Sequence, residues 1–186
     1  MKLIVGLGNP EQKYLPTLHN VGWRIVEILA QAASWTNFSA RSRICRLPQT
    51  DTLLLRPQTF MNESGESVRE VVEYYKIALP DLWVVHDDLD LPAGQGRLSF
   101  DSSSAGHRGV QSIIDALGTK TFWRFRVGIG RPPQNTPAED YVLQVASNEI
   151  ANLLQTSERV AVTAIEQALK NGIAAAQNAW ENKTAP

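Results

Sequence analysis

The chain is poor in the residues that mark secreted, metal-binding and membrane proteins. It has 186 residues and one cysteine, Cys45, so no disulfide can form within it, and a reducing compartment fits this composition. No apolar run is long enough to span a bilayer, and the first residues lead directly into a strand and a turn. We therefore expect a cytoplasmic protein with no secretory signal and no membrane partner.

An excess of charge of one sign is also missing. The net charge is −1, so a nucleic acid would have to be held by a local basic patch rather than by the whole surface. A hydrophobic content of 43% over this length is enough for one domain with a sizeable core. Because no repeat or linker interrupts the chain, we expect residues 1–186 to form a single domain, frayed after about residue 181.

Short apolar runs alternate with amphipathic segments along the chain. The pattern predicts strands at residues 3–5, 44–47, 52–55, 82–85 and 122–129, with a turn at 48–51. It predicts helices at residues 21–33, around 68–75 with Asn62 as the N-cap, around 113–117 ending at Gly118, at 147–170, and a short one in the tail. This order predicts an α/β fold: one domain with a central mixed, largely parallel sheet, flanking helices and a C-terminal helix.

The loop after the first predicted strand is where we expect chemistry. The sequence KLIVGLGNPEQKYLPTLHNVGW places Asn9, Tyr14 and His19 between that strand and the first helix. Ligands of open α/β sheets bind beyond the carboxyl ends of the strands. These three side chains are therefore candidates for a binding or catalytic site.

The glycines of GLGNPE permit a second interpretation, a dinucleotide-binding loop. The fingerprint G-x-G-x-x-G needs its third glycine for close packing of helix on strand, and Glu11 stands in that position. The predicted helix also begins too late. The sequence therefore disfavours nucleotide binding.

A metal site is the alternative suggested by His86, Asp87, Asp88 and Asp90 at the end of a predicted strand. With only three histidines and no HxH, HExxH or CxxC spacing, the sequence lacks the usual ligand patterns. An acidic strand end in contact with solvent explains the cluster more simply. We expect neither a metal nor another cofactor.

A third interpretation pairs His19 with the carboxylate of Asp87. A neutral imidazole is the usual general base near neutral pH, and a carboxylate on its other nitrogen fixes the tautomer. No G-x-S-x-G motif supplies a nucleophile, so water would attack, with Asn9 or Asn62 orienting the substrate. A lone loop histidine is, however, more often an ordinary surface residue.

Phosphate contacts could come from several basic residues, and stacking contacts from Tyr14 and Phe60. The basic candidates are Arg97, Arg108, Lys120, Arg124 and Arg126. Arg124 and Arg126 share one face of a predicted strand, because side chains alternate along it. On the residues alone, an ordinary solvated surface is the favoured interpretation of this group.

Five motifs in order give the chain a family resemblance. GLGNPxxxYxxTxHNxGW, RPxTFMNxSG, HDDLDLPxGxxR, GHxG and FxRxRxGIGRP, from Lys2 to about Val142, together resemble the bacterial-type peptidyl-tRNA hydrolases. The resemblance implies a single α/β domain, action as a monomer, and hydrolysis of the ester between peptide and tRNA. The implied partner is peptidyl-tRNA, bound through the tRNA acceptor end, and no cofactor is implied.

The resemblance also implies roles for individual residues. His19 matches the family's catalytic base, Asp87 the carboxylate that holds it, and Asn9 the residue that helps distinguish peptidyl-tRNA from aminoacyl-tRNA. Substrate contacts are implied for an amide, two aromatic residues and one basic residue: Asn62, Tyr14, Phe60 and Arg126.

The chain departs from the family pattern at three positions: Glu11 replaces the usual glycine, Leu18 the usual arginine, and Arg108 the asparagine of Gly-His-Asn-Gly. Arginine keeps donors but loses the acceptor and adds a charge, so we expect Arg108 to approach a phosphate or the peptide carbonyl. Arg108 is also the single argument for a competing hypothesis, a non-catalytic RNA-binding relative. Retention of Asn9, His19, Asn62 and Asp87 together argues against it.

Overall fold

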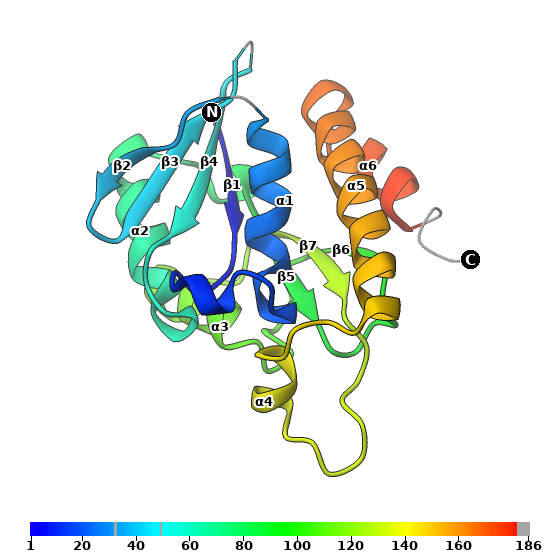
Figure 1. The fold of residues 1–186 in the computed structure, drawn as a ribbon. Coiled ribbons are helices and arrows are strands. Elements are labelled where there is room, and N and C mark those ends of the chain that lie inside the picture. Colours follow the sequence, from blue (N-terminus) through cyan, green and yellow to red (C-terminus); the bar gives the residue numbers. More distant parts are fainter. Residues whose placement is uncertain (32, 49, 182–186) are drawn as a thin grey trace.

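A single seven-stranded mixed sheet organises the chain (Figure 1). The computed structural model describes residues 1–31, 33–48 and 50–181. The strand order is β2-β3-β4-β1-β5-β7-β6, and the four central strands β4, β1, β5 and β7 run parallel to one another. At the edges, the pairs β2–β3, β3–β4 and β6–β7 are antiparallel. The strands are β1 (Lys2–Gly6), β2 (Thr36–Ser39), β3 (Ser42–Arg46), β4 (Thr52–Pro57), β5 (Leu82–Asp88), β6 (Gly96–Phe100) and β7 (Trp123–Gly128).

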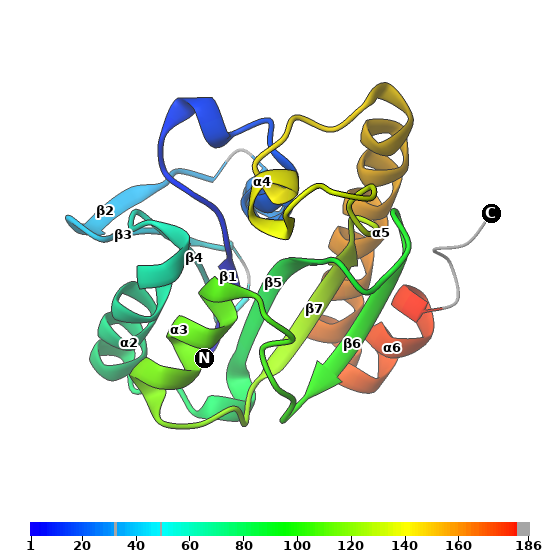
Figure 2. The same ribbon diagram turned by 90° about the horizontal axis from the view of Figure 1, so that it is seen from below.

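Helices cover both faces of this sheet (Figure 2). They are α1 (Val21–Ala30), α2 (Ser64–Tyr75), α3 (Arg108–Leu117), α4 (Ala138–Val142), α5 (Asn148–Asn171) and α6 (Ile173–Glu181), with 3₁₀ turns at Gln12–Tyr14, Leu18–Asn20, Met61–Glu63 and Leu79–Asp81. Alternate residues of β1 point to opposite faces, so Ile4 joins one core with α1, α5 and α6, while Leu3 and Val5 join the other with α2 and α3. This three-layer arrangement confirms the predicted α/β fold.

Several boundaries differ from the sequence predictions. Strands β2 and β6 and the short helix α4 were not predicted. β2 and β6 are edge strands whose residues are mostly exposed or half-buried, so they lack the apolar runs that mark the central strands. The first helix ends at Ala30 rather than at residue 33, and Ala32 lies outside the described residues, as do Gln49 of the predicted turn and the predicted frayed tail, residues 182–186.

Asn62 is not the N-cap of the second helix. It lies in the 3₁₀ turn Met61–Glu63, and Glu63 occupies the N-cap position of α2 without a side-chain cap. The 3₁₀ turn supplies the entry to the helix, so the amide of Asn62 is available for other contacts. The predicted end at Gly118 is confirmed, and α5, predicted to end at residue 170, ends at Asn171; Gly118 and Gly172 have positive φ at the C-caps of α3 and α5.

Two glycines allow α1 to approach the sheet closely. A Cβ on Gly6 would lie 2.3 Å from the carbonyl oxygen of Gly22, and a Cβ on Gly22 would lie 2.3 Å from the carbonyl oxygen of Val85 in β5. The start of α1 is therefore in backbone contact with β1 and β5. This contact places His19, which lies just before α1, next to the end of β5.

Within the described residues, no helix is long and apolar enough to cross a membrane.

Candidate active site

A pocket of about 620 Å³ lies at the carboxyl end of the central strands, with α4 on its far side. Its walls come from the loop after β1, the end of β5, the turn before α2, the N-terminus of α3, and α4. Seven of the eight predicted site residues line it: Asn9, Tyr14, His19, Phe60, Asn62, Asp87 and Arg108. The structure brings these seven residues together in one pocket, and their individual roles stay predictions.

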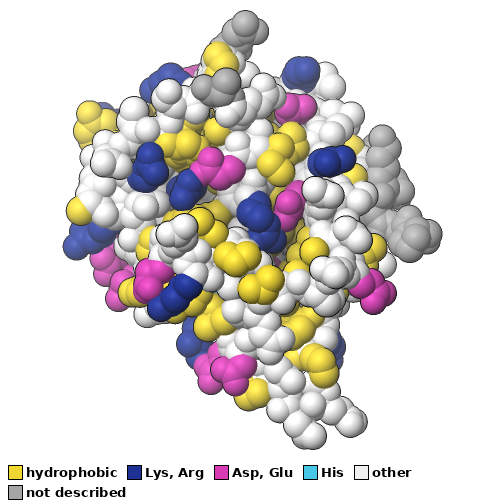
Figure 3. Space-filling view, in the orientation of Figure 1, with side chains coloured by type: hydrophobic (Ala, Val, Ile, Leu, Met, Phe, Trp, Pro, Cys, Tyr) yellow, Lys and Arg dark blue, Asp and Glu magenta, His cyan; other side chains and the backbone are white. Residues whose placement is uncertain are grey.

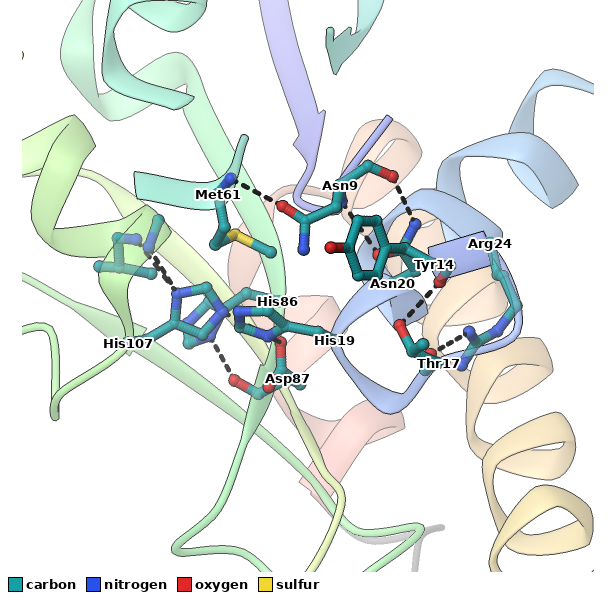
Figure 4. Close-up of polar contacts among 12 residues, drawn as sticks. Asn9, Tyr14, Thr17, His19, Asn20, Arg24, Met61, His86, Asp87 and His107 are labelled. Atoms are coloured by element: carbon teal, nitrogen blue, oxygen red, sulfur yellow. Dashed lines mark hydrogen bonds and ion pairs between the residues drawn. The ribbon is translucent and has the colours of Figure 1, made fainter. Parts of the chain in front are cut away.

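His19 and Asp87 are in direct contact although 68 residues separate them in the chain (Figure 4). The Nδ1 atom of His19 lies 2.8 Å from Oδ1 of Asp87, and both residues are buried. An ionised carboxylate can only accept a hydrogen bond, so Nδ1 carries the proton and Nε2 keeps its lone pair. Among the described residues, Nε2 of His19 has no hydrogen-bond partner, which leaves it available as a base.

His107 is a second histidine on the same carboxylate oxygen. Its Nε2 lies 3.0 Å from Oδ1 of Asp87, while its Nδ1 accepts hydrogen bonds from the backbone amides of Gly109 and Val110 at the start of α3. Because those amides can only donate, Nδ1 is unprotonated and Nε2 is the donor to Asp87. The N-terminus of α3 thus fixes one tautomer of His107, and His107 in turn helps hold the carboxylate.

Asp87 lies in the middle of this arrangement and is almost fully buried. Burial would raise its pKa, but the two histidines that face it, His19 and His107, hold the pKa of the carboxyl far below its usual range. The carboxylate is therefore ionised throughout the physiological range. It can orient His19 and stabilise the imidazolium that forms when His19 takes a proton.

His86 does not join the acidic cluster as a metal ligand. Its Nδ1 donates to the backbone carbonyl of Asp87 at 2.7 Å, and burial, with His107 nearby, lowers its pKa well below the ordinary value. Asp88 is bonded to Arg126 and to the backbone amide of Asp90. The predicted alternative of a site at residues 86–90 therefore has no converging ligands.

A different trio has donor atoms close enough for a metal ion, all within 4.8 Å of one another: His19, Asp87 and His107. These atoms are already joined by two hydrogen bonds, so a metal ion would have to displace both protons. The hydrogen bonds account for the arrangement, and the chemistry below needs no metal.

Asn9 is held in one orientation by contacts on both sides. Its Oδ1 accepts from the backbone amide of Met61 at 2.8 Å, so its Nδ2 remains as the donor on the pocket side. The side chain of Asn20, which is fully buried, makes two hydrogen bonds of 3.0 Å to the backbone of Asn9, one to its amide and one to its carbonyl. Asn20 therefore fixes the backbone from which the Asn9 amide projects.

The aromatic residues and Asn62 lie toward the mouth of the pocket. Phe60 is 45% exposed, Asn62 is exposed, and Tyr14 is half-buried. An exposed aromatic ring at a pocket mouth is suited to stacking on a base or a ribose. Their positions are consistent with the predicted substrate contacts.

Arg126 is the one predicted site residue that does not line the pocket. It lies on β7, and its Nε donates to Oδ2 of Asp88 at 2.5 Å, with 19% of the side chain exposed. Arg124, on the same strand face, is buried and donates to Ser102 and Ser103, so it serves the fold rather than a ligand. On the face drawn in Figure 3, basic side chains are scattered among acidic and apolar ones rather than gathered in one field.

Arg108 lies at the first position of α3, on the rim of the pocket, where it is 67% exposed. It pairs with Glu139 of α4, with 2.5 Å between Nη2 and Oε2. Both residues line the pocket from different walls. The structure thus gives Arg108 a partner that the sequence did not predict.

Three further residues of the site had no predicted role: Asn20, His107 and Glu139. Asn20 directly follows His19, and His107 is one of only three histidines and precedes α3, so both offered a signal in the sequence. Glu139 offered none, because α4 itself was not predicted. Its position depends on a hydrogen bond from the hydroxyl of Tyr141 to the carbonyl of Ile129, which ties α4 to the end of β7.

Comparisons with known proteins agree with this geometry. The sequence model of the family described as Peptidyl-tRNA hydrolase matches residues 3–186. Curated peptidyl-tRNA hydrolases of Syntrophomonas wolfei and Oceanobacillus iheyensis are 42% and 43% identical to the chain. The first match covers 97% of this chain and 100% of the relative, and the second covers 91% and 93%.

Solved structures give the same result for the fold. A crystal structure of peptidyl-tRNA hydrolase from Acinetobacter baumannii superposes with a TM-score of 0.89 at 31% identity, covering 97% of this chain and 94% of that one. A peptidyl-tRNA hydrolase crystallised with N-propanol gives a TM-score of 0.91 at 30% identity, with 100% and 97% coverage. The similarity therefore extends over the whole sheet and all the walls of the pocket.

Proposed function

Because this chain belongs to the peptidyl-tRNA hydrolase family and hydrolyses the ester between peptide and tRNA, we propose that His19 is the general base of that reaction. The observation that carries the proposal is the 2.8 Å contact between Nδ1 of His19 and buried Asp87, which leaves Nε2 as a free lone pair. In the family, the reaction recycles tRNA from aborted translation. An ester is reactive enough that a base, water and oriented donors suffice.

The chemical step follows from the geometry. Nε2 of His19 takes a proton from water as the water oxygen attacks the ester carbonyl carbon. The carboxylate of Asp87 stabilises the imidazolium that forms, and the same imidazolium then returns the proton to the departing ribose oxygen. The products are a peptide with a free carboxyl group and a tRNA with a free terminal hydroxyl.

The amides bind the peptide side of the ester. We propose that the Nδ2 group of Asn9 donates to a carbonyl oxygen of the substrate, because its Oδ1 is already used by Met61. Asn62, exposed in the turn Met61–Glu63, supplies a second amide. A site with a fixed donor at this place favours a substrate with a peptide carbonyl over a free amino group.

The tRNA side is assigned to the aromatic and basic residues. We propose that Tyr14 and Phe60 stack on the 3′ end, that Arg108 contacts a phosphate, and that Arg126 contributes positive charge beside the pocket. Because few phosphates are neutralised, the affinity should fall by about tenfold when salt is raised severalfold. Action as a monomer in the cytoplasm remains part of this proposal.

The test is release of free peptide from purified N-blocked aminoacyl-tRNA by the wild-type protein, without added transition metal. The expected result is release of peptide at a rate that saturates as the concentration of N-blocked aminoacyl-tRNA is raised. Binding of tRNA without release of peptide would contradict the proposal and support the non-catalytic RNA-binding alternative. Inhibition by a strong chelator of transition metals would contradict the metal-free chemistry.

A further inference from the structure

The ion pair between Arg108 and Glu139 joins two walls of the pocket that are distant in the chain. Arg108 begins α3, and Glu139 lies on α4, which follows the loop after β7. The side chains are 67% and 61% exposed. An exposed ion pair of this kind contributes little to folding stability, so it is easily exchanged for another pairing.

The backbone on each side of the pair is fixed by other contacts. On one side, His107 precedes Arg108 directly and is bonded to Asp87 and to the N-terminus of α3. On the other, α4 is tied by Tyr141 to the carbonyl of Ile129, and the backbone amide of Leu18 donates to the carbonyl of Gln144 just after it. The two charges therefore meet because rigid elements present them, while only the side chains need to move to separate them.

The chemistry of the pair matches the substrate. The guanidinium group of Arg108 is a planar donor whose geometry suits both carboxylates and phosphates. The carboxylate of Glu139 occupies it at 2.5 Å on the rim of the pocket, where the tRNA 3′ end is proposed to bind. A phosphate of the substrate and the carboxylate of Glu139 therefore require the same donor.

We propose that Glu139 is a specificity-determining residue that competes with substrate phosphate for Arg108. Because the carboxylate is tethered, it acts at a high effective concentration and outcompetes small free anions. A tRNA end, held also by stacking and by the amides of the pocket, displaces it. Displacing Glu139 costs the same free energy for every phosphate ligand, so a ligand with further contacts, such as a tRNA end, still binds well, whereas inorganic phosphate and short nucleotides do not. This inference rests on the proposed tRNA contact of Arg108.

The experiment compares Glu139→Gln with Asp140→Asn on the same helix. Both changes remove one negative charge, but Asp140 forms no ion pair among the described residues. With N-blocked aminoacyl-tRNA as substrate, Glu139→Gln should lower KM about threefold to tenfold and leave kcat unchanged. Inorganic phosphate should inhibit this variant at a severalfold lower concentration than it inhibits the wild type. Asp140→Asn should change both values by less than twofold.

The same pair of changes in an Arg108→Asn background isolates the contact. With Arg108 absent, Glu139→Gln should have no larger effect than Asp140→Asn. Equal effects of the two changes in the wild-type background, or an effect of Glu139→Gln that persists without Arg108, would overturn the proposal. Thermal melting controls for folding, since loss of this exposed pair should leave the melting temperature nearly unchanged.

Failure of the proposed function gives a different result. If the wild type binds tRNA but releases no peptide, the hydrolase assignment fails. The competition between Glu139 and phosphate can then still be measured as the affinity for deacylated tRNA of Glu139→Gln and Asp140→Asn, each with and without Arg108→Asn. If turnover is normal and the two charge-removing changes are equivalent, only the inference about Glu139 fails.

Discussion

The two walls of the pocket differ in how their charges are held. On the inner wall, Asp87 is almost fully buried and bonded to His19, whose tautomer it fixes, and to His107, whose tautomer is fixed by the N-terminus of α3. On the outer rim, Arg108 and Glu139 are mostly exposed and bonded mainly to each other. A buried hydrogen-bonded carboxylate preorganises a base, whereas an exposed pair can exchange partners at little cost. The comparison suggests that chemistry is assigned to the inner wall and substrate selection to the rim.

The largest effect on the inner wall should come from Asp87→Asn. The amide keeps the size of the side chain but loses the charge that stabilises the imidazolium, so the rate constant kcat should fall about 10²–10⁴-fold. The substitution removes the negative charge that stabilises the protonated form of His19. The acid limb of the pH–rate profile should therefore move to lower pH. Rate measurements from pH 5 to 9 check this. A profile that keeps its position would assign Asp87 a structural role only.

A smaller effect is expected from Asn20, which joins the inner wall to Asn9. Asn20→Ala removes both hydrogen bonds to the Asn9 backbone, and we expect about a tenfold loss in discrimination between N-blocked and free aminoacyl-tRNA. The acid limb should not move, because the contact between His19 and Asp87 remains. The measurement is kcat/KM for the two substrates.

Thr17→Val is the matched control for Asn20. Thr17 is buried in the same loop, and its hydroxyl donates to the carbonyl of Tyr14 rather than to Asn9. The control should lose stability without losing discrimination. Equal losses of discrimination in both variants would show that Asn20 acts through general loosening of the loop.

The smallest effect concerns stability rather than rate. Burial, with His107 nearby, lowers the pKa of His86, so the unfolded chain takes up a proton that the folded chain does not as pH falls below about 6.5. Stability from this group is therefore present above that pH and is lost as pH falls toward the folded pKa. Urea unfolding at pH 7.5 and pH 5.0 should show a loss in the wild type about 1 kcal/mol larger than in His86→Asn.

Asparagine is chosen for this test because it keeps a donor for the carbonyl of Asp87. Asp87 does not interfere in that pH window, since its own lowered pKa contributes stability that is lost only below about pH 4. Equal pH dependence in the two proteins would show that His86 is protonated in the folded state.

The central strands and the inner wall could be predicted because their signals are local. An apolar run marks β1, another marks β5, and the polar residues that follow each run meet at the carboxyl ends of the strands. The pairing of His19 with Asp87 follows from this topology, although its distance depends on the close approach of Gly6 and Gly22 that only the structure displays.

The rim could not be predicted for a physical reason. Glu139 lies on a helix of five residues that is too short to show helical periodicity, and its position is set by a tertiary hydrogen bond between Tyr141 and Ile129. The edge strand β6 was missed because glycine, arginine and serine dominate it. The prediction that Asn62 caps α2 was wrong, since a 3₁₀ turn begins the helix in place of a side-chain cap.

The most direct test of the account is the pH dependence of kcat/KM for N-blocked aminoacyl-tRNA in the wild type and in His19→Ala. The account predicts that the wild-type rate falls toward acid pH, because a protonated imidazole cannot act as a base. It predicts that His19→Ala loses about 10²–10⁴ in rate and no longer shows this acid limb. A variant that keeps both the wild-type rate and the limb would contradict the assignment of His19 as the base.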